Sequence, residues 1–218
     1  MSTPRKTPRQ QRSEFTFDAI LDAAARLFQQ HGYAATTTNK IAELAGVSIG
    51  TLYHYVPNKD ALLYALAERH LRQAAVTLLE TAARLRAEQP PLVETIRQLV
   101  AAVTRLHTAQ PDLHRLLFDR APRTAEGVER LRELERVLAG EVEFQLRRLE
   151  VGGGDPALTA LLLVQAVQAQ IHGTVLDPPD GRTADECGRA IIDLWTRALT
   201  PPATPCRPAA ESAGEGHR

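Results

Sequence analysis

Apolar residues recur along this chain at intervals of three and four, the spacing that places them on one face of an α-helix. Ile20, Ala24, Leu27 and Phe28 follow this pattern, and alternating runs of strand-favouring residues are absent. We therefore predict an all-α fold of about nine helices. The expected bounds of eight of them are residues 17–31, 38–45, 49–56, 92–108, 111–118, 125–150, 155–176 and 184–199. A long fourth helix follows Asn58 and precedes the chain break at residues 89–91.

Residues that start and stop helices support these bounds. Four polar residues stand where a side chain would cap the first turn of a helix: Thr16, Ser48, Asn58 and Thr183. Gly32 and Gly46 follow the last apolar residue of a helix, where glycine adopts the left-handed conformation without strain. Proline and glycine clusters separate the later helices, at residues 89–91, 152–154 and 177–181.

The composition divides the chain into four segments: a flexible basic arm at 1–13, a first domain at 14–60, a second domain at 61–200 and a disordered tail at 201–218. The arm contains Arg5, Lys6, Arg9 and Arg12 and no acid before Glu14. It either binds phosphates or acts as a solubilising tail. The tail is rich in proline, alanine, glycine and glutamate.

Charge and cysteine content restrict the class of protein only weakly. The 26 basic and 26 acidic residues cancel, so any nucleic-acid surface must come from the local distribution of charge. Two cysteines are too few for a disulfide framework.

No stretch approaches the roughly 20 uncharged apolar residues that span a bilayer, and no apolar secretory signal is visible. We expect a cytoplasmic protein without a membrane partner.

Residues 37–56, TTNKIAELAGVSIGTLYHYV, have the pattern of a helix-turn-helix. Ala42 is small enough for two helices to approach closely, and Gly46 fits the turn between them. Ile41, Val47 and Leu52 are expected to point inward. The opposite side of the third helix then carries Ile49, Gly50, Thr51, Tyr53 and His54.

This outward set differs from an ordinary solvent-exposed face, which would carry Glu, Lys or Arg. Glycine inside a helix costs about 1 kcal/mol relative to alanine, so Gly50 indicates that something bulky approaches closely. Thr, Tyr and His side chains contact phosphates and base edges in a major groove. The alternatives are a plain helical hairpin with a polar outer face and, for His54, a surface histidine without a role.

The block from about Thr16 to Ala65 resembles the tetracycline-repressor (TetR) family of transcription regulators. The stretch AILDAAARLFQQHGYAATTTNKIAELAGVSIGTLYHYVPNKDALL follows the family pattern nearly throughout. It departs at Ile49, where lysine is common, and at Val56, where phenylalanine is usual. The resemblance implies a dimeric DNA-binding regulator, usually a repressor released from a palindromic operator by a small-molecule ligand.

Carried over to this sequence, the resemblance implies DNA contacts from the recognition helix and its surroundings. Ser48, Ile49, Gly50, Thr51, Tyr53 and His54 would face the groove. Thr37, Thr38 and Asn39 would meet the backbone at the start of the preceding helix, and Lys59 would hold a phosphate.

The family also implies that the second domain binds a ligand and dimerises through its last two helices. The residues expected at the dimer interface are Leu162, Ala166, Ala169, Gly173, Ile191, Leu194, Trp195 and Ala198. The stripe Gln165, Gln168 and His172 either forms hydrogen bonds at that interface or lines a cavity. The other candidates for a pocket that takes a small apolar or aromatic ligand are Leu99, Val103, His107, Leu117, Phe118 and Phe144.

Catalytic and metal-binding functions have no support in the sequence. No phosphate loop, nucleophile elbow or conspicuous carboxylate pair occurs, and Cys187 lies in a poor setting for a lowered thiol pKa. His107 and His114 are seven residues apart, but Pro111 interrupts the helix on which they would share a face. We therefore expect no enzyme activity, no cofactor and no metal site.

A DNA-binding architectural protein without an effector is the other alternative, and it would need no cavity.

Overall fold

A computed structural model describes residues 8–122 and 124–200 of the 218-residue chain. These residues form nine α-helices and one π-helical turn and contain no strand, which confirms the predicted all-α fold. The helices are α1 (Pro8–Ala35), α2 (Thr38–Ala45), α3 (Ile49–Tyr55), α4 (Lys59–Glu88), α5 (Leu92–Thr108), α6 (Pro111–Arg120), α7 (Ala125–Arg148), α8 (Pro156–Gln170), its π-helical continuation η1 (Ile171–Val175), and α9 (Ala184–Leu199).

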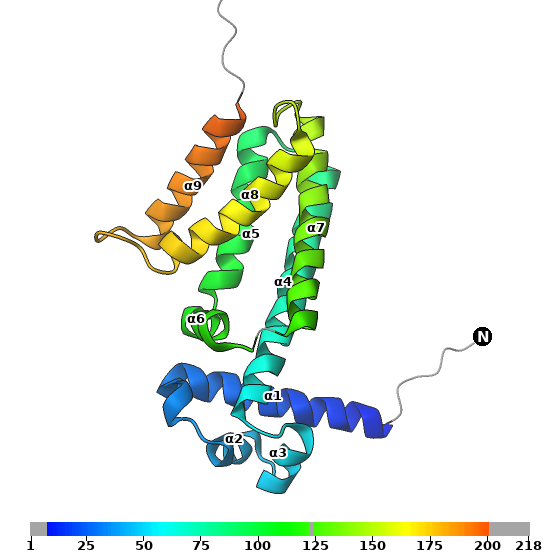
Figure 1. Ribbon diagram of the computed structural model, residues 1–218, viewed down its shortest axis with the longest axis vertical. Coiled ribbons are helices and arrows are strands. Elements are labelled where there is room, and N and C mark those ends of the chain that lie inside the picture. The colour runs from blue at the N-terminus through cyan, green and yellow to red at the C-terminus, as the bar shows by residue number, and fades with distance from the viewer. Residues whose placement is uncertain (1–7, 123, 201–218) are drawn as a thin grey trace, which may run out of the picture.

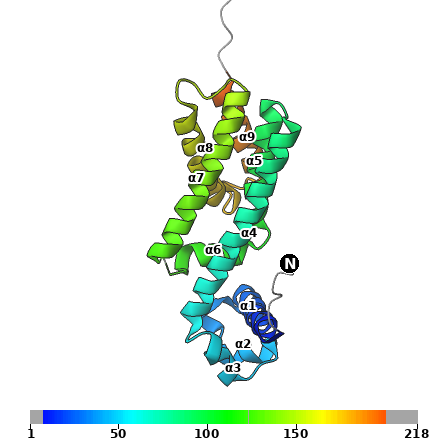
Figure 2. The ribbon, with the colours of Figure 1, turned by 90° about the vertical axis from the view of Figure 1, so that its right-hand side faces the viewer.

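The helices are arranged in two parts joined by one long helix. In Figure 1, α1, α2 and α3 form the lower part, and α5, α7, α8 and α9 form the upper part. Helix α4 runs from the lower part into the upper one, and α6 lies at the junction. The view turned by 90° shows the same division (Figure 2).

Helix α1 begins earlier than the sequence predicts. Thr16 is not its N-cap, because the Thr16 hydroxyl donates a hydrogen bond to the Arg12 carbonyl inside the helix, at 2.9 Å. Residues 9–15 contain no proline or glycine that would break a helix. Pro8 fits the first turn, where its missing N–H would have no partner in the helix. Residues 8–13 are therefore helical where a flexible arm was expected. The rest of the predicted arm, and the predicted tail, lie outside the described residues.

Two clusters of buried apolar side chains form the cores. The N-terminal core joins α1, α2, α3 and the first turns of α4, and it also includes Leu113 and Leu117 of α6. The C-terminal core joins α5, α7, α8, η1 and α9 around residues such as Val100, Leu146 and Ile171. Because the N-terminal core extends to Leu66, it crosses the predicted boundary at residue 60, and that boundary remains a prediction.

The end of the predicted helix 155–176 is not a regular α-helix. Its last turn is the wider π-turn η1, which contains His172 and Gly173. A π-turn adds a residue to the turn and so changes the direction in which the following side chains point. The periodicity of the sequence carries no signal for this change.

One helix, Pro156–Val175, is long and apolar enough to cross a membrane by length and composition, and no other described helix is. The expectation that no such segment exists is wrong, since these residues include no Asp, Glu, Lys or Arg. Core helices of helical bundles pass the same test. Here Leu163, Val167 and Ile171 pack in the C-terminal core.

Candidate nucleic-acid interface and ligand cavity

Local hydrogen bonds fix the helix-turn-helix. The Thr37 side chain accepts from the Lys40 amide at the start of α2, and Ser48 accepts from the Thr51 amide at the start of α3. Gly46 closes α2 in the left-handed conformation, with φ 69°. Leu52 and Ile41 are fully buried between the helices, as the sequence predicts.

The outer face of α3 carries the residues expected there. Ser48, Ile49, Gly50, Tyr53 and His54 are exposed, and Thr51 is half-buried beside Ser48. The side chain of Tyr53 is joined to α2 because its hydroxyl lies 3.1 Å from the Thr38 hydroxyl. Thr37 and Asn39 are also exposed, at the N-terminal end of α2. Together these side chains form one surface that is polar apart from Ile49 and contains no Asp, Glu, Lys or Arg.

The ammonium of Lys59 has partners within the protein. It donates to the carbonyls of Tyr33 and Thr36, at 2.7 and 2.9 Å, and lies 4.2 Å from the centroid of the Tyr33 ring. The neighbouring Asp60 accepts from the Tyr33 hydroxyl. Burial, followed by this bond, raises the pKa of Tyr33 to about 12. Lys59 thus joins the end of α1 to α4. Because two of its three ammonium N–H groups donate to these carbonyls, only the third can make the predicted contact with a DNA phosphate.

Lys59→Met is expected to lower the free energy of unfolding by about 1–3 kcal/mol, because two partly buried carbonyls lose a charged donor. Lys40→Met is the control, since Lys40 is exposed and makes a single bond of 3.3 Å, to the Ala35 carbonyl. It should change stability by less than about 0.5 kcal/mol. Urea unfolding of both variants measures the difference, and equal stabilities would contradict the assigned role of Lys59.

A cavity of about 250 Å³ lies between α4, α5, α6, α7, α8 and η1. Most of its lining is aliphatic. Seven of the nine predicted pocket residues line it: Leu99, Val103, His107, Leu117, Phe118, Gln168 and His172. The other two do not. Phe144 packs under the Arg86 guanidinium, 3.7 Å from its ring centroid, and Gln165 is exposed on the outer side of α8.

Gln145 is a polar residue of the lining that the sequence pattern missed. It is buried, and its side-chain oxygen accepts from Arg148 Nε at 2.9 Å. Its amide nitrogen has no partner among the described residues. A buried N–H without an acceptor is costly, so a ligand with a carbonyl or hydroxyl oxygen would satisfy it. Its position on an otherwise charged helix gave no sequence signal.

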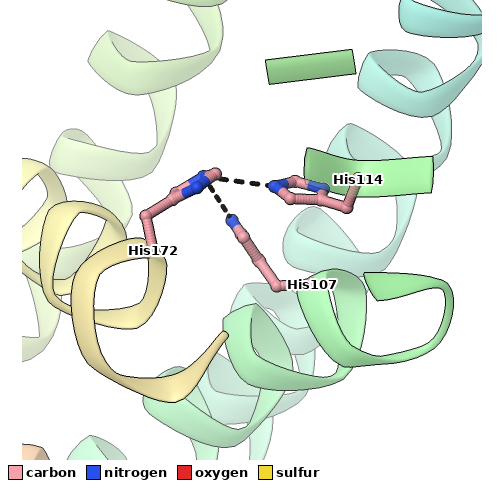
Figure 3. A group of neighbouring side chains, drawn as sticks. All are labelled: His107, His114 and His172. Carbon is pink, nitrogen blue, oxygen red and sulfur yellow. Dashed lines mark hydrogen bonds between the residues drawn. The ribbon is translucent and has the colours of Figure 1, made fainter. Parts of the chain in front are cut away.

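Four histidines meet at one end of the cavity. His172 Nε2 lies 3.0 Å from His107 Nε2 and 3.2 Å from His114 Nε2, as Figure 3 shows. His114 Nδ1 lies 3.0 Å from His70 Nε2. The argument that Pro111 separates His107 from His114 is wrong. Pro111 starts α6, which turns back, so that the two ring centroids are 4.2 Å apart.

The histidine cluster is uncharged at neutral pH. Burial, followed by the neighbouring histidines, lowers the pKa of His114 to about 3 and that of His172 to about 4. Burial also lowers the pKa values of His70 and His107. Each ring therefore carries one N–H and one lone pair.

An apolar strip on the outside of α8 and α9 includes most of the predicted dimer contacts. Leu162, Ala169, Gly173, Leu194 and Ala198 are exposed, and Ala166 is half-buried. The remaining two positions pack within the chain. Ile191 is buried in the C-terminal core, and Trp195 Nε1 donates to Gln170 Oε1 at 3.0 Å.

Two family models match the chain. One, described as bacterial regulatory proteins of the tetR family, matches residues 20–66. The other, described as a tetracyclin repressor-like C-terminal domain, matches residues 91–194. The first includes α2 and α3, and the second includes most residues of the cavity.

Curated relatives of this chain are also described as HTH-type transcriptional regulators, although each match covers a shorter stretch of sequence. The chain is 32% identical over 96 residues to the HTH-type transcriptional repressor ComR of Escherichia coli, a stretch that covers 44% of each chain. The chain spans less than half the length of that relative and of two regulators of Mycobacterium tuberculosis to which it is 36% identical.

Solved structures share the fold. A TetR/AcrR-family regulator from Thermobifida fusca has a TM-score of 0.67 at 23% identity, covering 84% of this chain and 98% of that one. FadR from Bacillus subtilis, solved in complex with stearoyl-CoA, has a TM-score of 0.63 at 18% identity, covering 84% and 100%.

Proposed function

The chain belongs to the tetR family of bacterial regulatory proteins, and we propose that it is a repressor that a small molecule releases from its operator. Its helix-turn-helix binds DNA. One observation supports the release step above all others: Leu117 of α6 lines the cavity and also packs in the N-terminal core. A ligand that displaces Leu117 therefore acts directly on the packing of the DNA-binding part.

Helix α6 is the element through which the two parts communicate. Leu113 packs in the N-terminal core, while His114 and Phe118 line the cavity. Arg115 donates to the Leu176 carbonyl at the end of η1. A shift of α6 on ligand binding would therefore move α1 relative to α4. Release requires that the ligand bind the shifted state more tightly than the DNA-bound state.

The cavity favours a small, mostly apolar or aromatic ligand with one acceptor oxygen. Its volume of about 250 Å³ is near the lower end for ligand pockets. The unpartnered Gln145 amide supplies a donor. FadR of B. subtilis binds stearoyl-CoA, but at 18% identity that ligand does not transfer to this chain.

The operator would be a palindrome read by two protomers. The exposed leucines of α8 and α9 support a two-fold interface. Such a dimer holds two recognition helices about 34–36 Å apart, one turn of DNA. The polar surface of α3, with Tyr53 and His54, would enter the major groove on each half-site.

Filling the cavity should separate operator binding from ligand response. Ala74 lines the cavity, so Ala74→Phe should occupy ligand space and abolish release while operator affinity stays within about threefold. Ala83 is exposed on the same helix and outside the lining, and Ala83→Phe should leave both properties unchanged. The measurement is fluorescence anisotropy on DNA selected from a random pool, with a compound library as competitor.

Two outcomes would contradict the proposal. One is a failure of every compound in the library to release wild-type protein from its selected DNA. The other is full release of Ala74→Phe by the compound that releases wild type. The first outcome would favour a constitutive or architectural DNA-binding protein. Such a protein needs no ligand cavity, so the cavity between α4 and η1 is an argument for the regulator.

A further inference from the structure

The hydrogen positions in the histidine cluster follow from the partners of each ring. The Val103 carbonyl can only accept, so His107 Nδ1, which lies 2.7 Å from it, carries the ring proton. The neutral ring then has a lone pair at Nε2. His172 Nε2 lies 3.0 Å from that lone pair and must donate to it.

The same reasoning extends to the third ring. His114 Nε2 lies 3.2 Å from the donating His172 Nε2, so it too presents a lone pair. Its proton is on Nδ1, which donates to His70 Nε2 at 3.0 Å. Two lone pairs therefore compete for the single N–H of His172. If His172 moves its proton to its other nitrogen, three lone pairs point to one place.

We propose that His107, His114 and His172 bind a divalent transition-metal ion through their Nε2 atoms. Their ligand atoms all lie within 4.8 Å of one another. In a tetrahedral zinc site with bonds of 2.0–2.1 Å, two nitrogens are about 3.3–3.4 Å apart. The separations of 3.0 and 3.2 Å already match this spacing within a few tenths of an ångström. The third pair, which lies within 4.8 Å, would have to close by up to about 1.4 Å to reach the tetrahedral spacing.

The groups behind two of the three rings, His107 and His114, are those that metal-binding histidines require. A ligating imidazole donates its second N–H to a carbonyl, carboxylate or similar acceptor, which fixes the tautomer and the ring orientation. The Val103 carbonyl does this for His107, and His70 does it for His114. His70 is thus a positioning residue for the site, contributed by α4.

The surroundings leave a fourth coordination position and a route for the ion. All three rings line the main cavity, so a water or an oxygen of a ligand can reach the metal from that side. A second hollow, lined by Gln73, Arg105 and Gln110, shares His70 and His114 with the cavity. Neutral imidazoles suit zinc, copper, nickel and cobalt rather than magnesium or calcium.

The competing explanation is that the rings only pack against one another. Phe118 and His172 have centroids 4.3 Å apart, and such aromatic contacts need no ion. The two explanations differ in metal affinity, which is measured without DNA. The outcome is therefore independent of the proposed release mechanism.

Tag-free protein stripped of metal should bind one Co²⁺ per chain with the visible absorption of tetrahedral cobalt, and Zn²⁺ should displace it. His172→Ala should weaken binding at least about 100-fold, more than the loss of a supporting group does. His70→Phe, which removes such a group, should weaken it about 10- to 100-fold. His31→Ala, at an exposed histidine outside the cluster, should bind like wild type.

Thermal unfolding without metal checks that each variant folds, and His172→Gln replaces His172→Ala if the latter does not. Zn²⁺ should raise the unfolding temperature of wild type and of His31→Ala equally, that of His70→Phe less, and that of His172→Ala least. The proposal is overturned if wild type binds neither ion, or if removing the His172 imidazole leaves the affinity for Co²⁺ unchanged.

Discussion

Gly50→Glu is expected to weaken operator binding at least about 100-fold while the protein remains folded. A carboxylate at this position would face DNA phosphates, and like charges brought together in an interface cost several kcal/mol. Each 1.4 kcal/mol corresponds to a factor of ten in affinity. Gly50 lies on the exposed face of α3 beside Tyr53.

The fold has room for the new side chain. A Cβ at Gly50 would meet only the Ser48 hydroxyl, at an ordinary contact distance of 3.8 Å. Glutamate forms helices better than glycine by about 1 kcal/mol, and an acid in the first turn of α3 is favoured by the helix dipole. The unfolding temperature should therefore stay the same or rise.

Gly140→Glu is the matched control. Gly140 is exposed in the middle of α7, and a Cβ there meets nothing within 4 Å. The variant should gain similar stability and keep wild-type operator affinity. Anisotropy titrations beside thermal unfolding compare the two variants. If Gly50→Glu binds operator as tightly as Gly140→Glu, or if it unfolds, the DNA-binding face has been misplaced.

The sequence predicts the fold well wherever a local signal exists. Ser48, Asn58 and Thr183 cap their helices as expected, because the capping interaction involves residues only three positions apart. Thr16 is the exception. A threonine inside a helix has the same appearance as a cap when its hydroxyl bonds back to the preceding turn.

The site was predictable only in part, because its geometry depends on contacts between distant segments. Apolar periodicity identifies Leu99 and Val103 as inward-facing, but it cannot separate core from cavity wall. His70 and His114 are 44 positions apart in the chain and carry no common pattern, yet they share a hydrogen bond. The Pro111 argument failed because a helix break can bring two residues together as well as separate them.

Lys59 illustrates a different limit of prediction from sequence. Its place at the start of α4 was correctly identified from Asn58 and Asp60. The partners of its ammonium, the carbonyls at the end of α1, depend on how α1 and α4 cross. A charge at a helix terminus predicts an interaction, but the sequence does not identify which group is close enough to provide it.

Leu162→Glu is expected to convert the proposed dimer into monomers and to weaken operator binding by about 100-fold or more. Leu162 is 52% exposed on α8, between Leu158 and Ala166, and nothing among the described residues of its own chain covers this large apolar side chain. In a two-fold interface each substitution places two carboxylates in an apolar contact. A protomer that holds one half-site loses the gain from linked binding, a factor of 10²–10⁴.

Leu162 is a better test of assembly than Trp195, although both were predicted at the interface. The Trp195 indole donates to Gln170 within the chain, so its substitution would confuse folding with dimerisation. Leu79→Glu is the control, because Leu79 is 40% exposed on α4. Sedimentation velocity should give monomers for Leu162→Glu and dimers for wild type and Leu79→Glu. A Leu162→Glu dimer that binds operator normally would require an interface elsewhere, since a carboxylate pair cannot remain buried and unpaired in this one.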